Sequence, residues 1–154
     1  MIFCYSATQK SRLFADVLSD ILGKPVYMLE SAVNLGGSNT LRLLWPIITR
    51  QPVEVVNMPE DIPEDEIYIC APVWGGFPAS PIRAFLKHVR GKKVHMILTA
   101  GMGHIKYIKA ARKMIEDAGC IAGNVEVFAD GGDRKIVEEH IRELMLDLGS
   151  EENP

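Results

Sequence analysis

Residues 1–13, MIFCYSATQKSRL, combine an apolar run, a polar turn and the start of a helix. The run at residues 2–5 is rich in β-prone side chains, and from Leu13 to Ile21 apolar residues recur at helical spacing. A helix is therefore expected to begin near Ser11, directly after the turn. This strand–turn–helix unit decides the fold, because the same alternation continues along the rest of the chain.

The turn, Ser6-Ala7-Thr8-Gln9-Lys10-Ser11, carries three hydroxyl side chains. The first N–H groups of a helix have no partners within it, and the helix dipole favours negative charge there. Hydroxyls beside such N–H groups favour a phosphate-binding loop, to which Lys10 would add positive charge. The simpler alternative is that Thr8 or Ser11 only caps the helix, and this stretch alone does not decide between the two.

Apolar runs and helical patterns alternate along the remaining sequence. Gly23 and Pro25 end the first helix, and a second apolar run follows at residues 26–29. Further strands are expected at residues 67–71, 93–99 and 120–128, and further helices at residues 82–89, 105–115 and 133–148. Strand–helix–strand crossovers of this kind are right-handed, so the pattern predicts an α/β fold, a doubly wound α/β/α sandwich with a parallel sheet.

Residues 30–66 have the weakest pattern. Apolar residues at positions 41–48 indicate a short helix, bent or interrupted at Pro46. Trp45 lies within that apolar pattern and is interpreted as a packing residue. Residues 53–56 fit either a short extra strand or an extended cover over the core.

Two other loops have unusual composition, and both follow strands of the predicted sheet. In open parallel sheets, ligands bind beyond the carboxyl ends of the strands, where the winding order reverses. Residues 72–79 place Trp74 among glycines and prolines, which suits a ring that stacks on a flat ligand; alternatively, Trp74 plugs the end of the sheet. Residues 101–103, Gly-Met-Gly, allow close backbone approach, and a tight turn into a helix explains them equally well.

The composition is that of a globular protein, with 154 residues, 47% of them hydrophobic and 24% charged. We expect residues 1–149 to form a single domain and residues 150–154 to be a flexible C-terminal tail. No apolar stretch is long enough to span a bilayer and no secretory signal precedes the first strand, so we expect no membrane insertion and a cytoplasmic location. The net charge of −3 provides no basic face for nucleic acid.

The chain has three cysteines, Cys4, Cys70 and Cys120, at wide spacing. Each lies in or beside an apolar run, a pattern that favours neither a disulfide framework nor a zinc site. They are interpreted as buried thiols, and no metal site is expected.

Three segments resemble the flavodoxins and flavodoxin-like flavoproteins. The N-terminal IFCYSATQKS is similar to the family's phosphate loop, a hydroxyl-x-Thr-Gly-x-hydroxyl pattern after a strand, with matches at Ser6, Thr8 and Ser11. IYICAPVWGGFPASPIRAFL, at residues 67–86, is similar to the third-strand segment, in which a Pro-x-Trp run sets an aromatic ring against the isoalloxazine. TAGMGH, at residues 99–104, is similar to the fourth-strand loop.

The resemblance implies a flavodoxin-like sheet of five parallel strands in the order 2-1-3-4-5, of the short-chain type, that binds one FMN non-covalently. The first turn would hold the phosphate, the ring would lie between the other two loops, and Trp74 would stack on it. In the family, a glycine peptide of the third-strand loop can turn toward the flavin N5, which makes Gly75 and Gly76 candidates for that contact. The cofactor-binding residues implied are Ser6, Ala7, Thr8, Gln9, Lys10, Ser11, Pro72, Val73, Trp74, Gly75, Gly76, Phe77, Thr99, Ala100, Gly101, Met102 and Gly103.

The sequence departs from the family pattern at three places. Gln9 and Lys10 stand where Gly and Asn are frequent. The fourth-strand loop lacks the acidic and aromatic residues that often cover the second flavin face, a place that Met102 or His104 would take. The mild net charge differs from the strong acidity that steers basic redox partners in the family.

Bound flavin would make the chain an electron carrier that serves a redox partner protein or a small electron acceptor. A second interpretation is an NAD(P)H-dependent FMN/quinone oxidoreductase of the same fold. His95 or His104 would then supply protons, although His95 alternates within a strand as packed residues do. A third interpretation is a binding module that holds no flavin.

A fourth interpretation concerns a different class of enzyme. Residues 4–11 approach the Cys-x5-Arg-Ser loop of small tyrosine phosphatases, which also binds phosphate between a strand and a helix. Lys10 replaces the guanidinium that holds the phosphate in such enzymes, and Cys4 lies among apolar neighbours that disfavour a thiolate. The chemistry therefore argues against a phosphatase. The sequence leaves the oligomeric state open.

Overall fold

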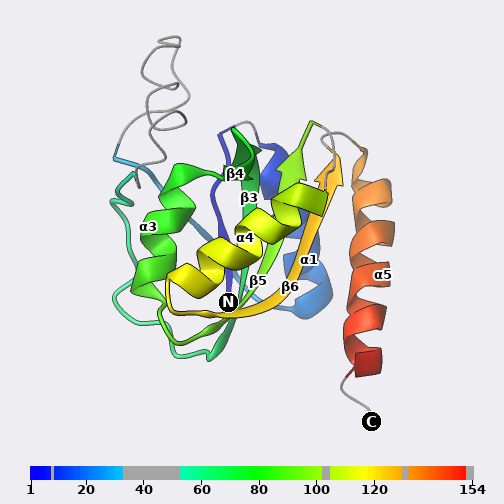
Figure 1. The fold of residues 1–154 in the computed structure, drawn as a ribbon. Helices are drawn as coiled ribbons and strands as arrows, with labels where there is room; N and C mark the ends of the chain where they lie inside the picture. The colour runs from blue at the N-terminus through cyan, green and yellow to red at the C-terminus, as the bar shows by residue number, and fades with distance from the viewer. Residues whose placement is uncertain (8, 33–52, 102–104, 130–131, 152–154) are drawn as a thin grey trace.

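The computed structural model describes residues 1–7, 9–32, 53–101, 105–129 and 132–151. Five parallel strands of this part form a sheet in the order β2-β1-β3-β5-β6, and β4 pairs with β3 outside that path (Figure 1). The elements are β1 (Ile2–Cys4), α1 (Lys10–Leu22), β2 (Val26–Met28), β3 (Glu66–Trp74), β4 (Phe77–Pro78), α3 (Ser80–His88), β5 (Lys93–Ala100), α4 (Ile105–Asp117), β6 (Ile121–Ala129) and α5 (Arg134–Glu151). The predicted α/β sandwich and strand order 2-1-3-4-5 are confirmed, since the two-residue antiparallel β4 only shifts the numbering.

Helices cover both faces of the sheet (Figure 1). Phe3 of β1 belongs to the buried cluster under α3 and α4, together with Phe85. Its neighbours Ile2 and Cys4 belong to the cluster under α1 and α5, together with Phe14. All three residues of β1 are fully buried, which explains why this strand is apolar at every position instead of at alternate positions.

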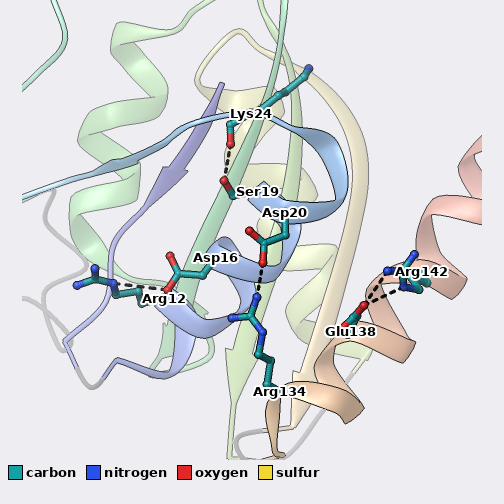
Figure 2. Close-up of polar contacts among 8 residues, drawn as sticks. All are labelled: Arg12, Asp16, Ser19, Asp20, Lys24, Arg134, Glu138 and Arg142. Atoms are coloured by element: carbon teal, nitrogen blue, oxygen red, sulfur yellow. Dashed lines mark hydrogen bonds and ion pairs between the residues drawn. The ribbon is translucent and has the colours of Figure 1, made fainter.

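Helix α1 ends at the glycine that the sequence indicated. Gly23 has a left-handed φ of 63°, and its N–H donates to the Ser19 carbonyl at 2.8 Å. The Ser19 hydroxyl donates to the Lys24 carbonyl at 2.6 Å, and Asp20 forms an ion pair with Arg134 of α5 (Figure 2). These contacts fix the carboxyl end of α1, so its amino end is held at the opposite edge of the sheet.

The segment expected to be a loop at residues 72–79 is largely β structure. β3 continues to Trp74, turns at Gly75 and Gly76, and returns as β4. Proline at position 72 had suggested a strand end, yet it lies in register with Thr99 because β3 continues along β5.

Other expectations have different outcomes. Residues 53–56 are an extended cover and not a strand, attached by an isolated antiparallel bridge between Ser31 and Val55. Helix α5 continues through Gly149 to Glu151, because glycine accepts helical dihedral angles at a cost of about 1 kcal/mol. The three cysteines are free and buried, as predicted. The helix expected at residues 41–48, with Trp45, lies outside the described residues.

None of the helices in the described ranges is long and apolar enough to cross a membrane.

His95 is buried near the amino end of β5, at the edge opposite the predicted ligand loops. Its Nδ1 accepts a hydrogen bond of 3.1 Å from the backbone N–H of Asn124, so Nε2 carries the proton that it donates to Glu66. Tyr68 stacks on the ring at 4.8 Å, and a Cβ on Gly123 would lie only 2.8 Å from it. His95 is therefore a packing residue, as its alternation within the strand indicated.

The buried imidazole should make the fold sensitive to acid. Burial lowers the pKa of His95 from its ordinary 6.5, an effect that Glu66 opposes. Because the unfolded chain binds this proton more readily, the contribution of His95 to stability is present above 6.5 and is lost as pH falls from 6.5 toward the folded pKa. Urea unfolding at several pH values between about 7 and 5 should show a smaller loss of stability in His95→Gln than in the natural chain. The control, His88→Gln at an exposed histidine, should keep the natural slope, and an unchanged slope in His95→Gln would contradict this assignment.

Candidate functional site

The carboxyl ends of β1, β3 and β5 bring the three predicted loops together. Strand register places Cys4 beside Cys70 and Pro72 beside Thr99. Ser11, in the first turn of α1, reaches the same place, since its Oγ lies 2.7 Å from Thr99 Oγ1. Segments that are far apart in the sequence therefore meet at one edge of the sheet, as the winding pattern predicted.

Ser11 and Thr99 form a buried hydroxyl pair beneath this edge. Their exposed fractions are 1% and 2%, and their contact with each other satisfies both side chains. The pair connects the first turn of α1 to β5. These two predicted ligand residues therefore stabilise the edge of the sheet at which the site lies. Ser11 does not cap α1, because the N-cap position is Gln9 and no side-chain hydrogen bond caps the helix there.

Ser6 has a buried hydroxyl with no partner. Among the side chains of the described residues, only Ser6 Oγ and Glu64 Oε2 are buried oxygens or nitrogens that lack a hydrogen bond. Leaving such a group unsatisfied costs about 1–3 kcal/mol. An anionic ligand in the turn would satisfy the hydroxyl, because a hydroxyl donates readily to a charged oxygen.

Gln9 takes the backbone conformation that glycine usually supplies. Its φ of 65° and ψ of −9° are left-handed, and it is the only non-glycine residue with positive φ in the described part of the chain. This conformation costs about 1–2 kcal/mol for a residue with a Cβ. Gln9 therefore adopts the left-handed conformation without the freedom of a glycine, at a cost in strain.

Gly75 and Gly76 form the two-residue turn of the β3–β4 hairpin. Their φ values of 57° and 89° are both left-handed, as a type I′ turn requires, and Trp74 pairs with Phe77 across it. Gly75 is exposed, so a ligand can approach the backbone at the tip of the hairpin.

Trp74 is half-buried, and its ring is held by an aromatic residue that the sequence pattern did not single out. The ring of Tyr5 meets it edge to face, with ring centroids 5.5 Å apart and planes at 83°. The Tyr5 hydroxyl lies 3.5 Å from Ser31 Oγ, and burial raises the pKa of Tyr5. The signal was available, because Tyr5 is the last aromatic residue before the turn.

Tyr107, in the first turn of α4, is a second residue that the sequence analysis missed. Its Cε1 lies 3.8 Å from the position that a Cβ on Gly76 would occupy. An aromatic side chain therefore stands beside the hairpin on the side of the fourth-strand loop. Met102 and His104, which were considered for this place, lie outside the described residues.

No protein-family model and no curated protein sequence matches the chain. Several solved structures are similar to the chain. A protein from Bacteroides uniformis ATCC 8492, provisionally assigned as a flavoprotein, superposes with a TM-score of 0.74 at 19% identity over 92% of this chain and 96% of its own. A flavoprotein from Lactobacillus acidophilus NCFM in complex with FMN gives 0.64 at 22% identity over 82% and 90%. The two-electron reduced flavodoxin of Megasphaera elsdenii gives 0.51 at 16% identity over 92% and 99%.

The chain has a flavodoxin-like fold. Within it, the predicted site residues fall into groups by accessibility. Exposed or half-buried at the carboxyl edge are Ser6, Ala7, Gln9, Lys10, Pro72, Val73, Trp74, Gly75, Gly76, Phe77 and Gly101. Buried beneath them are Ser11, Thr99 and Ala100, while Thr8, Met102 and Gly103 lie outside the described residues.

Removing one hydroxyl of the buried pair should destabilise the flavodoxin-like fold. Ser11→Ala leaves Thr99 Oγ1 without its partner, so the free energy of unfolding should fall by about 1–3 kcal/mol. Thr99→Val should have a similar effect. The double variant should lose less than the sum of the two, because both partners are then absent. Urea unfolding of all four proteins measures the coupling, and strict additivity would contradict the pairing.

Strain at Gln9 gives a second expectation. Gln9→Val should lower the free energy of unfolding by about 1 kcal/mol or more, because a β-branched side chain disfavours the left-handed conformation most. Gln9→Gly should be tolerated, since relieved strain offsets the greater freedom of glycine in the unfolded chain. Urea midpoints should rank the glycine variant above the valine variant, and the reverse order would show that the turn is not left-handed at this position.

Proposed function

We propose that the chain binds one FMN non-covalently and acts in electron transfer. The observation that carries this proposal is the unpartnered, buried Ser6 Oγ in the turn before α1, at the carboxyl edge of a flavodoxin-like sheet. A phosphate would supply the acceptor that this hydroxyl lacks. The FMN complex of the Lactobacillus acidophilus protein, which shares the fold, supports the choice of ligand.

The turn supplies the polar groups for the phosphate. Ser6 would donate its hydroxyl, and Thr8 would donate a second. The exposed Lys10 would add charge. With Gln9 in its left-handed conformation before α1, the amino end of the helix would contribute N–H groups to the phosphate.

The β3–β4 hairpin would hold the flavin ring. Trp74 would lie against the ring face, oriented by its edge-to-face contact with Tyr5. Gly75 and Gly76 allow the ring edge to approach their backbone polar groups, since neither carries a Cβ. When bound, FMN supplies one-electron and two-electron redox chemistry.

Within this proposal, a carrier is preferred to a turnover enzyme. His95, one of two histidines considered for proton supply, is buried at the opposite edge with both ring nitrogens engaged. The other, His104, lies outside the described residues. We further propose that the chain acts as one domain in the cytoplasm, a location that suits its three free thiols.

Ser6→Ala should affect the apoprotein and the complex in opposite directions. Removing the unsatisfied hydroxyl should leave the apoprotein as stable or more stable, by up to about 1–3 kcal/mol. The dissociation constant for FMN should rise about 10-fold to 100-fold, because a charge-assisted hydrogen bond worth about 1.5–3 kcal/mol is lost. Titration of the apoprotein with FMN, followed by flavin fluorescence, measures the binding, and thermal unfolding measures the stability.

The matched control is Ser19→Ala. The Ser19 hydroxyl donates to the Lys24 carbonyl at 2.6 Å, away from the carboxyl edge, so its loss should lower stability and leave FMN affinity unchanged. An unchanged FMN affinity in Ser6→Ala would remove Ser6 from the site. Absence of any flavin absorbance or thermal protection at saturating FMN in the natural chain would refute the proposed function.

A further inference from the structure

Positive charge is concentrated in one stretch of the sequence. Residues 80–117 contain nine Lys and Arg but only two Asp and Glu, a formal charge of +7. The rest of the chain has eight basic and 18 acidic residues, a formal charge of −10. Residues 80–117 include α3 and α4, which lie on the same face of the sheet (Figure 1). The net charge of −3 therefore conceals a basic segment that includes both of these helices.

A groove of about 330 Å³ lies between α3 and α4 on this face. Its floor is apolar and includes Phe77, Ala110 and Met114. Basic side chains from both helices, Arg83, Lys87 and Lys113, stand around it. The acidic residue in the lining, Asp117, is paired with Lys113 at 3.0 Å. An apolar floor with a basic rim is complementary to an apolar side chain carried on an acidic surface.

The lining of the groove includes one residue of the β3–β4 hairpin. Phe77 at its end pairs with Trp74 across the hairpin turn. Tyr107 of α4 approaches Gly76 at the same turn. A protein seated in the groove would therefore also stand beside the hairpin that is proposed to hold the flavin ring.

We propose that the α3–α4 groove docks a redox partner protein that presents an acidic surface with an apolar anchor side chain. The charge and shape of the groove determine the acidic, apolar character of the partner. That the partner is a redox protein rests on the proposed function. A protein fits this surface better than a nucleic acid does, because a phosphate backbone has no apolar side chain to bury on the floor of the groove.

The probe is a purified acidic ferredoxin with a [2Fe–2S] cluster, in its oxidised form, added to the FMN-loaded chain. Isothermal titration calorimetry at about 0.01 M salt should detect binding, and about 0.2 M salt should weaken it strongly, because screening shortens the range of the charges. Lys87→Glu should weaken binding about tenfold or more at low salt, since it places like charges across the interface. Ala110→Phe, which fills the groove without changing charge, should also weaken binding.

Lys135→Glu, at an exposed position in α5 on the other face of the sheet, is the matched charge control and should bind the probe nearly as well as the natural chain. Flavin absorbance and thermal unfolding of every variant report FMN binding and folding separately from docking. The probe is also titrated into the apoprotein, so a failure to bind FMN is distinguished from a failure to dock.

Four results would overturn the proposal. The first is the absence of probe binding at low salt, and the second is an equal loss of affinity in Lys135→Glu and Lys87→Glu. The third is full displacement of the probe by a single-stranded oligonucleotide of equal charge, which would indicate a general polyanion surface. The fourth is self-association that Lys87→Glu abolishes, which would assign the groove to a second copy of the chain. Loss of affinity confined to the two groove variants, with flavin retained, would support it.

Discussion

The candidate site depends on the complete burial of β1. Ile2, Phe3 and Cys4 have no exposed surface, and β2 and β3 occupy both edges of the strand. Burial of a large apolar side chain such as Ile2 or Phe3 contributes about 1.5–3 kcal/mol. A strand buried in this way requires helices on both faces, which the right-handed crossovers supply. The chain leaves β1 for one side of the sheet and later returns to its other side, so the turn after β1 emerges where the winding reverses. The position of this turn is thus a consequence of core burial.

The turn after β1 contains two energetically unfavourable features. Ser6 carries an unsatisfied hydroxyl and Gln9 a strained backbone, within a few residues of a fully satisfied pair formed by Ser11 and Thr99. Together the two unfavourable features cost roughly 2–5 kcal/mol, a sizeable fraction of the stability of a small domain. Local conflicts of this kind are expected where a site is shaped for a ligand and not for the fold. The neighbouring strand β1 has no such unfavourable features, so a polar ligand is the simplest explanation for those of the turn.

Sequence patterns predicted the elements that depend on local periodicity and missed the features that depend on tertiary contact. Periodicity predicted the main strands and helices of the described residues and the end of α1 at Gly23. The resemblance predicted the strand order. The β3–β4 hairpin was not, because Pro72 and the glycines indicate a loop while pairing with β5 extends the strand. The role of Ser11 could not be predicted because it depends on a contact with Thr99, 88 residues away in the sequence. The place of Tyr107 could not be predicted because it depends on the packing of α4 against the hairpin.

The uneven distribution of charge along the sequence also bears on partner choice. A net charge sums over the whole molecule, but charges beyond about 10 Å from an interface are largely screened at moderate salt. A partner docked in the groove would therefore experience the side chains of its lining, such as Lys87, and would be little affected by acidic residues on the α1 and α5 side. The mild net charge already departs from the strong acidity that steers basic redox partners in the flavodoxins, and the groove has more basic than acidic side chains in its lining. If the proposed docking holds, fold and partner preference are set by separate features of this sequence, the first by buried apolar strands and the second by side chains on two helices.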